Sequence, residues 1–459
     1  MIHKNILEAI GNTPIVRVNS VAKSCPAHIH AKLEFMNPGG SIKDRIGWYI
    51  IEDAEKKGLI KPGGTIVEST SGNTGFGLAI AAAIKGYKCI FVLPDKMSDE
   101  KIKSLRAFGA KVVVTPTAVE PEDPRSYYSV SKRLTQETPN AFYTDQYNNL
   151  ANRECHTKYT GPEILKQMPD IDVFIAGIGT GGTICGVGKY LKEKKPDVKI
   201  VAVDPVGSLV YDYFKTKKFV KAKTYLIEGI GEDFLPGNYD FSVIDDMVQV
   251  EDKESFLMTR ELLKKEGIYS GISSGAAMVG ALRWIESQKG KLKNKNVLVM
   301  LPDSGNRYLS KAYDDDWMRE AGFLDKSNLG TVEDLLRKTK IDQNKIVMAK
   351  QNDKVSTVVE LMRDNGYSQL PVVDEKGWIK GVVKQGSLLT ALLENKINQA
   401  DPIEIITDTS IEFVTPLDSI EKISKLVSDG KVPVVTDPDH KDKLIAIITT
   451  IDLISYFGS

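Results

Sequence analysis

The stretch of sequence that decides the fold reads Thr65-Ile66-Val67-Glu68-Ser69-Thr70-Ser71-Gly72-Asn73-Thr74-Gly75. Residues 65–68 are rich in β-branched side chains and predict a short strand. The glycines after it predict a tight turn, and the small and apolar residues 77–84 predict a helix. A strand, a glycine-rich turn and a helix in this order are typical of a parallel sheet covered by helices.

The same alternation continues to about residue 301. Helical periodicity fills the segments between the strands, as in residues 44–56, where Ile46, Ile50 and Ala54 recur every four positions. We therefore predict an α/β fold with mostly parallel sheets and a ligand site beyond the carboxyl ends of the strands. The predicted strands, buried on both faces, are 65–68, 89–93, 111–115, 173–176, 200–203 and 297–301.

A second α/β unit follows a polar break at residues 325–330. It contains an internal repeat of about sixty residues, in which a helix precedes two strands. The first copy has these elements at 355–365, 370–374 and 379–383, and the second has them at 419–429, 432–436 and 444–448. The expected domains are 1–325, a linker at 326–342, and repeats at 343–396 and 397–459.

Composition excludes several classes of function. The 61 basic and 61 acidic residues cancel, which argues against nucleic-acid binding by general electrostatic attraction. The N-terminus lacks the apolar core of a secretory signal, and the longest apolar stretch, 444–457, is too short to span a membrane. The four cysteines are widely spaced and the five histidines are not paired at ligand spacing, so we expect a cytoplasmic protein without a metal site.

Four segments combine glycines with small hydroxylated residues: 37–45, 69–75, 177–183 and 270–275. Lys43 stands where the first segment enters a helix, a position that disfavours a cation because of the helix dipole. Most lysines are surface charges, but an amine held there would be useful as a Schiff base with an aldehyde cofactor. The third segment lacks the lysine of a P-loop, and its glycines and threonines suit a single phosphate group.

Taken together and in this order, the segments resemble those of fold-type II pyridoxal-phosphate (PLP) enzymes with the tryptophan synthase β-like fold. Within that group the chain is similar to the cysteine synthase and cystathionine β-synthase family. The stretches that carry the resemblance are 38–45, 70–75, 145–147, 179–183, 203–205, 228–231 and 301–304.

The resemblance implies a role for each site residue. Lys43 would hold PLP covalently and move protons, Asn73 would bind the ring hydroxyl, and Ser273 would face the pyridine nitrogen. The residues implied in binding the cofactor phosphate are Gly179, Thr180, Gly181, Gly182 and Thr183. Those implied in binding substrate are Thr70, Ser71, Thr74, Gln146 and Gly229.

The reaction implied is β-replacement of the hydroxyl of L-serine by L-homocysteine, which gives L-cystathionine, with hydrogen sulfide production as a further possibility. The alternative is a cysteine synthase that uses O-acetylserine and sulfide. The loop 228–234 and the C-terminal repeats favour the first reaction. Two features argue against this reaction. Many relatives have tyrosine at the position of Glu232, and residues 271–277 have a form common in cysteine synthases.

The repeats resemble tandem CBS domains, a Bateman module, which bind adenosine-containing ligands. Thr449 and Asp452 match the ribose-binding step, whereas the first copy lacks its aspartate at 384–387. Tyr367 and Gln369 would line the same site, and the expected ligand is S-adenosylmethionine or an adenine nucleotide. The alternative is a module that only dimerises or stiffens the enzyme.

Two further expectations rest on the same resemblance. The chain begins almost directly at the region 5–17, leaving no room for the haem-binding segment of animal relatives, so no haem is expected. A homodimer or homotetramer is expected from fold-type II relatives. A sensor with a degenerate catalytic domain is disfavoured because Lys43, Asn73 and Ser273 are all present.

Overall fold

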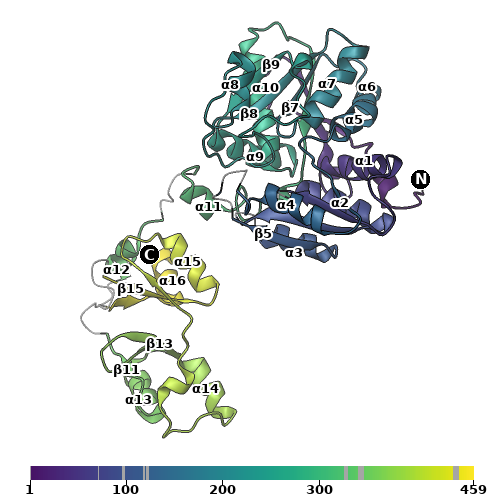
Figure 1. Cartoon of the computed structure of the whole chain (residues 1–459). Helices are drawn as coiled ribbons and strands as arrows, with labels where there is room; N and C mark the ends of the chain where they lie inside the picture. The colour runs from purple at the N-terminus through teal and green to yellow at the C-terminus, as the bar shows by residue number, and fades with distance from the viewer. Residues whose placement is uncertain are drawn as a thin grey trace. The chain divides into compact units, whose positions relative to one another are not determined.

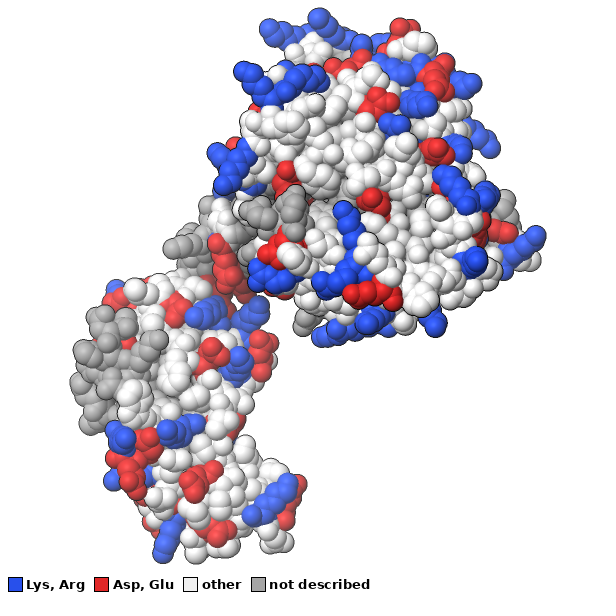
Figure 2. Space-filling model, in the orientation of Figure 1, with Lys and Arg blue, Asp and Glu red and all other residues white. Residues whose placement is uncertain are grey.

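The computed structural model describes residues 2–70, 72–95, 99–116, 119, 123–324, 329–339, 346–437 and 444–458. The chain divides into two compact units, Met1–Leu324 and Asp325–Ser459, both visible in Figure 1. On the face drawn in Figure 2, basic and acidic side chains are interspersed over each unit. None of the described helices is long and apolar enough to cross a membrane.

The larger sheet of the first unit is parallel except at one edge, where β1 and β2 are antiparallel. Within the described residues its strands are, in order, β1 (Ile15–Arg17), β2 (His28–Leu33), β10 (Asn296–Leu301), β7 (Val173–Gly177), β8 (Lys199–Pro205) and β9 (Asp246–Val250). Alternate residues of its strands enter different cores. Val173 and Ile175 pack in the core that contains α10, whereas Phe174 and Ala176 pack in the core that contains α7.

The smaller sheet of the first unit is parallel throughout. Its described strands are, in order, β5 (Lys111–Thr115), β4 (Lys88–Pro94), β3 (Thr65–Ser69) and β6 (Ala141–Tyr143). All of the predicted strands are present, and the α/β prediction is confirmed.

Helices cover both sheets (Figure 1). Those of the first unit are α1 (Lys43–Lys56), α2 (Asn73–Lys85), α3 (Asp99–Ala107), α4 (Tyr127–Glu137), α5 (Ala151–Cys155), α6 (Gly161–Gln167), α7 (Gly182–Lys194), α8 (Val210–Thr216), α9 (Asp252–Glu266), α10 (Ile272–Ser287) and α11 (Asp315–Glu320). Helices α1 and α2 approach each other through Gly47 and Gly77. A Cβ on Gly47 would lie 2.3 Å from the carbonyl carbon of Gly77, so only glycine permits this contact.

The second unit contains two small sheets built alike. In each, a parallel pair is followed by an antiparallel strand. The first repeat contains β11 (Ala349–Lys350), α13 (Val355–Asn365), β12 (Gln369–Val373), β13 (Ile379–Lys384) and α14 (Gln385–Leu393). The second contains β14 (Ile411–Val414), α15 (Ile420–Ser428), β15 (Val432–Thr436), β16 (Leu444–Ile447) and α16 (Thr450–Gly458). The predicted duplication is confirmed.

The charged sequence 331–340 in the predicted linker has a helix-like pattern, and the structure has a helix there. Part of the predicted linker at 326–342 forms α12 (Val332–Thr339). Its apolar residues Val332, Leu335 and Leu336 are buried with residues of α15 and α16 in the core of the second repeat. This helix therefore belongs structurally to the second repeat, although it precedes the first one in the sequence.

Candidate active site

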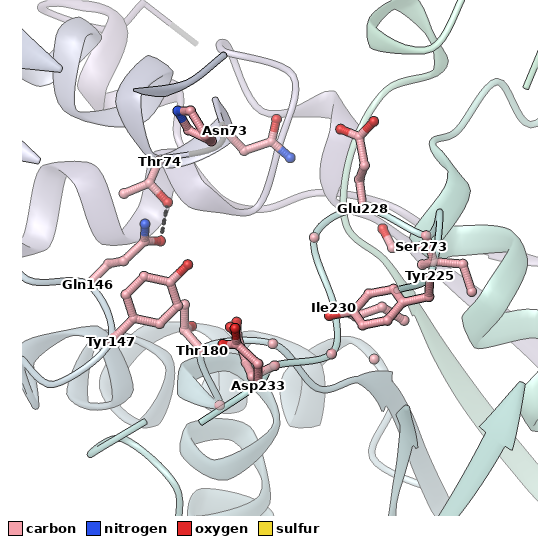
Figure 3. Close-up of a pocket in the computed structure, with 18 of the residues that line it drawn as sticks. Asn73, Thr74, Gln146, Tyr147, Thr180, Tyr225, Glu228, Ile230, Asp233 and Ser273 are labelled. Carbon is pink, nitrogen blue, oxygen red and sulfur yellow. Dashed lines mark hydrogen bonds between the residues drawn. The ribbon is translucent and has the colours of Figure 1, made fainter. Parts of the chain in front are cut away.

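A cavity of about 1070 Å³ lies in the first unit, where the carboxyl ends of the parallel strands meet the starts of several helices (Figure 3). It is bordered by residues that follow β3 and β7 and by the starts of α1 and α10. The predicted site residues that line it are Lys43, Asn73, Thr74, Gln146, Gly179, Thr180, Gly181, Thr183, Gly229 and Ser273.

The remaining predicted residues of this site lie outside the cavity lining. Thr70 is buried, and its Oγ1 accepts a hydrogen bond from the backbone N–H of Gly72 at 3.0 Å. Gly182 packs behind the lining, against Asn152. Ser71 lies outside the described residues. Thr70 therefore contributes to the shape of the turn rather than directly to the cavity wall.

Lys43 is the first residue of α1, and its side chain reaches into the cavity. Its Nζ lies 3.4 Å from Oγ1 of Thr180. Burial lowers the pKa of the Lys43 amine to about 8, although the negative charges of Glu232 and Glu68 act in the opposite direction. Such a lysine carries a useful fraction of neutral, nucleophilic amine near neutral pH.

The glycine-rich loop before α7 forms a cradle that no larger residue could line. Gly181, the N-cap of α7, has φ of +82°, and a Cβ there would lie 2.3 Å from the ring of Tyr239. A Cβ on Gly179 would lie 2.7 Å from the carbonyl oxygen of Gly229. The loop therefore brings bare backbone and the N-terminus of α7 to the cavity, an arrangement that fits a phosphate group.

Two buried side chains that the sequence did not point to support this cradle. Asn152 donates hydrogen bonds to Oγ1 of Thr180 at 3.1 Å and to the carbonyl of Gln146 at 2.7 Å. His156 lies between Oγ1 of Thr160 at 2.9 Å and Oγ1 of Thr183 at 3.3 Å. Burial keeps the pKa of His156 well below its usual value, so the ring is neutral. Neither residue belongs to a recognisable motif, and only the fold brings them to the loop.

The side chain of Asn73 is held by protein groups. Its Nδ2 donates to Oδ2 of Asp303 at 2.8 Å, and its Oδ1 accepts a hydrogen bond from Arg307. Asp303 is buried and also accepts from the hydroxyl of Tyr308 at 2.7 Å. The role of Asn73 toward the cofactor stays a prediction, and Asp303 and Arg307 join the site as the groups that orient it.

Thr74 and Gln146 form a hydrogen-bonded pair in the cavity wall. The Thr74 hydroxyl donates to Oε1 of Gln146 at 2.6 Å (Figure 3). From behind, Nε2 of Gln146 donates to the carbonyl of Ser69 at 3.1 Å, and the Gln146 backbone N–H donates to Glu68 at 3.2 Å. Burial raises the pKa of Glu68 to about 8. Gln146 is therefore fixed on two sides, as a residue that orients a substrate should be.

Ser273 stands in the first turn of α10 and is almost completely buried at the edge of the cavity. The N-cap of α10 is Gly271, where a Cβ would lie 2.1 Å from Oδ1 of Asp303. This close approach ties the start of α10 to the same aspartate that orients Asn73. Ser273 thus presents a neutral hydroxyl at a fixed place in the wall.

Comparison with known proteins assigns the family. Residues 6–303 match the family model described as "Pyridoxal-phosphate dependent enzyme", and residues 332–394 and 403–459 match the model of the CBS domain. The chain is 39% identical over 477 residues to "Cystathionine beta-synthase" of Dictyostelium discoideum, covering 99% of this chain and 92% of that protein. The chain belongs to the cystathionine β-synthase family.

Solved structures of other enzymes are similar to part of this chain as well. A hydrogen sulfide-producing enzyme from Fusobacterium nucleatum is 38% identical, with a TM-score of 0.62, and the match covers 67% of this chain and 98% of that one. A cysteine synthase from Entamoeba histolytica is 33% identical, with a TM-score of 0.63, over 72% of this chain and 97% of that one. The predicted resemblance to PLP enzymes with tandem CBS domains is confirmed.

PLP is the cofactor that membership of the cystathionine β-synthase family implies, and the cavity fits it. The amine of Lys43 lies beside Thr180 of the glycine cradle, so one group could hold the cofactor aldehyde while the loop holds its phosphate. Ser273 and Asn73 line the same cavity and would contribute a neutral hydroxyl and an amide to hold the cofactor ring.

In the CBS repeats, the predicted ligand residues lie at the ends of two different sheets. Tyr367 is 38% exposed just before β12, and Gln369 is the first residue of that strand. Thr449 precedes α16, and both its backbone N–H and its hydroxyl donate to Oδ2 of Asp452, at 2.8 and 2.6 Å. The Asp452 carboxylate therefore also caps the start of α16.

The same Thr-x-x-Asp geometry occurs at two other places in this unit. Thr331 donates to Asp334 at the start of α12, and Thr415 donates to Asp418 just before α15. A threonine followed three residues later by aspartate is thus a recurrent capping device here.

Proposed function

We propose that this protein catalyses PLP-dependent β-replacement, joining L-serine and L-homocysteine to give L-cystathionine and water. The observation that carries the proposal is the amine of Lys43, with its pKa lowered to about 8, beside the phosphate-type cradle of a cystathionine β-synthase family member. The match to the Dictyostelium discoideum enzyme also spans the CBS repeats, since it covers 99% of this chain.

Different residues of the chain have different roles in this reaction. When bound, PLP supplies the electron sink that makes the α-proton of an attached amino acid acidic. Lys43 anchors the cofactor and then accepts and returns protons at the substrate α-carbon and its leaving hydroxyl. The glycine cradle and Thr183 hold the phosphate. Thr74, with Gln146 behind it, holds the substrate carboxylate together with the backbone of the turn 70–75.

Ser273 tunes the chemistry by being neutral. A carboxylate opposite the pyridine nitrogen would keep that nitrogen protonated, whereas a hydroxyl does not. The weaker electron sink favours loss of a group from the β-carbon over transamination. Asn73, oriented by Asp303 and Arg307, binds the ring hydroxyl in this proposal.

The alternative activity is cysteine synthesis from O-acetylserine and sulfide. It is favoured by the similarity to the cysteine synthase from Entamoeba histolytica and by residues 271–277. The test is kcat/KM of the purified holoenzyme with serine and homocysteine against O-acetylserine and sulfide. A higher value for the first pair supports the proposal, and a higher value for the second replaces it.

For the C-terminal unit we propose an adenosine-containing ligand, S-adenosylmethionine or an adenine nucleotide, bound by Tyr367, Gln369, Thr449 and Asp452. Support comes from the match of both repeats to the CBS domain. We also propose that the protein forms a homodimer or a homotetramer. We expect it to function in a reducing, cytoplasmic compartment. The four cysteines form no disulfide, in keeping with that compartment.

A further inference from the structure

A π-helical turn, His156–Thr160, joins α5 to α6 and packs against α7. The backbone N–H of Gly161 donates to the carbonyl of His156, which closes the wide ring of such a turn. π turns are rare, and those inside α-helices often occur at functional sites. This one contacts Thr183 in the first turn of α7, the part of the helix that the proposed function assigns to the cofactor phosphate.

A glycine of α7 lets the π turn approach closely. A Cβ on Gly186 would lie 2.7 Å from Cβ of His156 and 2.4 Å from the carbonyl oxygen of Arg153. The hydroxyl of Thr157 also donates to the carbonyl of Gly186 at 3.1 Å. His156 is fully buried. Its imidazole is therefore held at one place beside α7.

The imidazole of His156 bridges two threonine hydroxyls. Nδ1 lies 2.9 Å from Oγ1 of Thr160, and Nε2 lies 3.3 Å from Oγ1 of Thr183. Thr160 is fully buried, whereas Thr183 lines the cavity. Among the residues that the structure describes, neither hydroxyl has another hydrogen-bond partner in the protein. The state of the ring therefore decides where both hydroxyl hydrogens point.

The ring of His156 is neutral. Burial is the main cause that lowers its pKa well below the usual value, and the positive charges of Arg45 and Lys43 act in the same direction. In a neutral imidazole one nitrogen carries a hydrogen and donates, and the other accepts. Two arrangements of the hydrogens between Thr160 and Thr183 follow from this.

Hydrogen-bond satisfaction selects one of the two arrangements. If Nδ1 carried the hydrogen, it would donate to Thr160, and the hydroxyl hydrogen of Thr160 would be buried without an acceptor. If Nε2 carries the hydrogen, Thr160 donates to Nδ1, and Nε2–H donates to Oγ1 of Thr183. No buried donor is then left without a partner. The hydroxyl hydrogen of Thr183 remains available to an acceptor in the cavity.

A phosphate group is the acceptor that suits this second arrangement. Its anionic oxygens accept hydrogen bonds strongly, and a hydroxyl that donates to them forms a charge-assisted hydrogen bond. In the first arrangement Thr183 would give its hydrogen to the ring and turn only lone pairs toward the phosphate, which would repel them. The tautomer of a residue outside the cavity lining therefore decides whether Thr183 attracts the phosphate.

We propose that His156 is a positioning residue that fixes the hydroxyl of Thr183 as a hydrogen-bond donor to the phosphate of the cofactor. Thr160 sets the tautomer of the ring, so that each of the three residues donates toward the cavity. The inference rests on the proposed function and deepens it, because it names a residue that acts on the cofactor only through another side chain.

Titration of the apoenzyme with PLP tests this role. We expect His156→Leu to raise the dissociation constant of PLP about tenfold, since a hydrogen bond to a charged group loses its orientation. In the Thr183→Val background, which lacks the hydroxyl, the same substitution should change the dissociation constant by less than about twofold. An equal effect in both backgrounds would overturn the proposal, because His156 would then not act through Thr183.

Two further variants separate positioning from packing. In His156→Gln the amide accepts from Thr160 and donates to Thr183, so PLP affinity should stay within about threefold of wild type. Thr157→Val removes the hydroxyl that ties the same turn to Gly186, and we expect a change of less than about threefold. If Thr157→Val weakens PLP binding as much as His156→Leu, the packing of the turn explains the loss and the proposal is wrong.

The tautomer can be read in the wild-type protein. Two-dimensional 1H–15N NMR of apoenzyme labelled at its five histidines gives the protonated nitrogen, and the signal lost in His156→Gln assigns the ring. We expect a neutral ring that carries its hydrogen on Nε2 from about pH 6 to about pH 9. A hydrogen on Nδ1 would overturn the proposal, even if His156→Leu fails to fold.

Failure of this inference is distinguishable from failure of the proposed function. Neither the PLP titration nor the NMR spectrum depends on which β-replacement the enzyme catalyses. A wild-type protein that takes up no PLP overturns the proposed function and the role of His156 together. A protein that takes up PLP but carries the hydrogen on Nδ1 overturns the role of His156 alone.

Discussion

Three helices that begin at the cavity of the first unit start differently from two helices of the second unit. In the first unit, α2, α7 and α10 begin at the cavity after Gly72, Gly181 and Gly271, which have no side chain to cap them. In the second unit, α12 and α16 begin at a Thr-x-x-Asp step whose carboxylate folds back onto the cap. The first kind of start attracts anions from outside, whereas the second already carries a negative charge.

This difference indicates what each unit can recognise. The glycine starts of the first unit suit the phosphate of a cofactor and the carboxylate of an amino acid. The acidic starts of the second unit suit hydroxyl groups that donate to a carboxylate, such as those of a ribose. The following predictions test the two halves of this contrast, beginning with the largest effect.

Lys43→Ala removes the side-chain amine of the first residue of α1. Activity should fall by about 10³-fold or more, because both the covalent anchor and the proton carrier are lost. The measurement is β-replacement activity, together with borohydride trapping of PLP and peptide mapping. Lys56→Ala, at the exposed end of the same helix, is the matched control and should behave as wild type. A label that maps to another lysine in the wild-type enzyme would show that the start of α1 does not hold the cofactor.

Gly182→Ala tests whether the cradle before α7 needs bare backbone. The added Cβ would lie 1.9 Å from Oδ1 of Asn152, a residue that holds Thr180. We expect PLP affinity to fall about tenfold or more, since a buried hydrogen bond is disturbed. Titration of the apoenzyme with PLP gives the result.

The matched control for that substitution is Gly386→Ala in α14, where no atom lies within 4 Å of the added Cβ. It should leave PLP affinity unchanged and stabilise the helix by about 0.5–1 kcal/mol, because alanine is the better helix former. If both alanines reduce PLP affinity alike, the contrast between the two units is lost.

Asp452→Ala tests the capped start of α16. The substitution should weaken the binding of ATP or S-adenosylmethionine about tenfold and reduce stability by about 1 kcal/mol through loss of the cap. Asp418→Ala removes the same geometry just before α15 and serves as the control. Isothermal titration calorimetry should find the affinity loss only in Asp452→Ala. An equal loss in both variants would reduce Asp452 to a structural cap.

The smallest effect concerns the protonation of Lys43 in the apoenzyme. Burial lowers the pKa of its amine to about 8, so the neutral form increases with pH up to that value rather than up to the usual 10.5. The rate of covalent PLP capture should rise about fivefold from pH 7 to pH 8 and then level off. Stopped-flow absorbance measures it. A rate that still climbs steeply well above pH 8 would contradict the lowered pKa.

The sequence predicted those parts of the fold that depend on local pattern. Strands β7 and β10 were found because both of their faces are buried, which produces uninterrupted apolar runs. Strand β2 was not predicted, since it contains Lys32, which is buried against Glu163 at 2.5 Å. A charge that is neutralised by a residue 131 positions away looks like a surface charge in the sequence.

The residues of the site also fall into two groups, those with a local signal in the sequence and those that only the fold brings to the cavity. The glycine loops and Lys43 are local signals and could be recognised from their order along the chain. Asn152, His156 and Asp303 support these loops from other elements, and no spacing in the sequence connects them to the cavity. Helix α12 was assigned to a linker because its apolar positions, such as Leu335, are set among charged residues.

The close contact between Gly47 and Gly77 has a consequence for engineering. A Cβ on Gly77 would lie 2.4 Å from the carbonyl oxygen of Lys43, so neither helix accepts even a methyl group at the crossing. Helices α1, which carries Lys43, and α2, which begins at Asn73, must therefore move as one unit whenever the cavity changes shape. A designer who wishes to admit a bulkier first substrate has to redesign the surrounding loops, because this pair of helices cannot be moved apart by single substitutions.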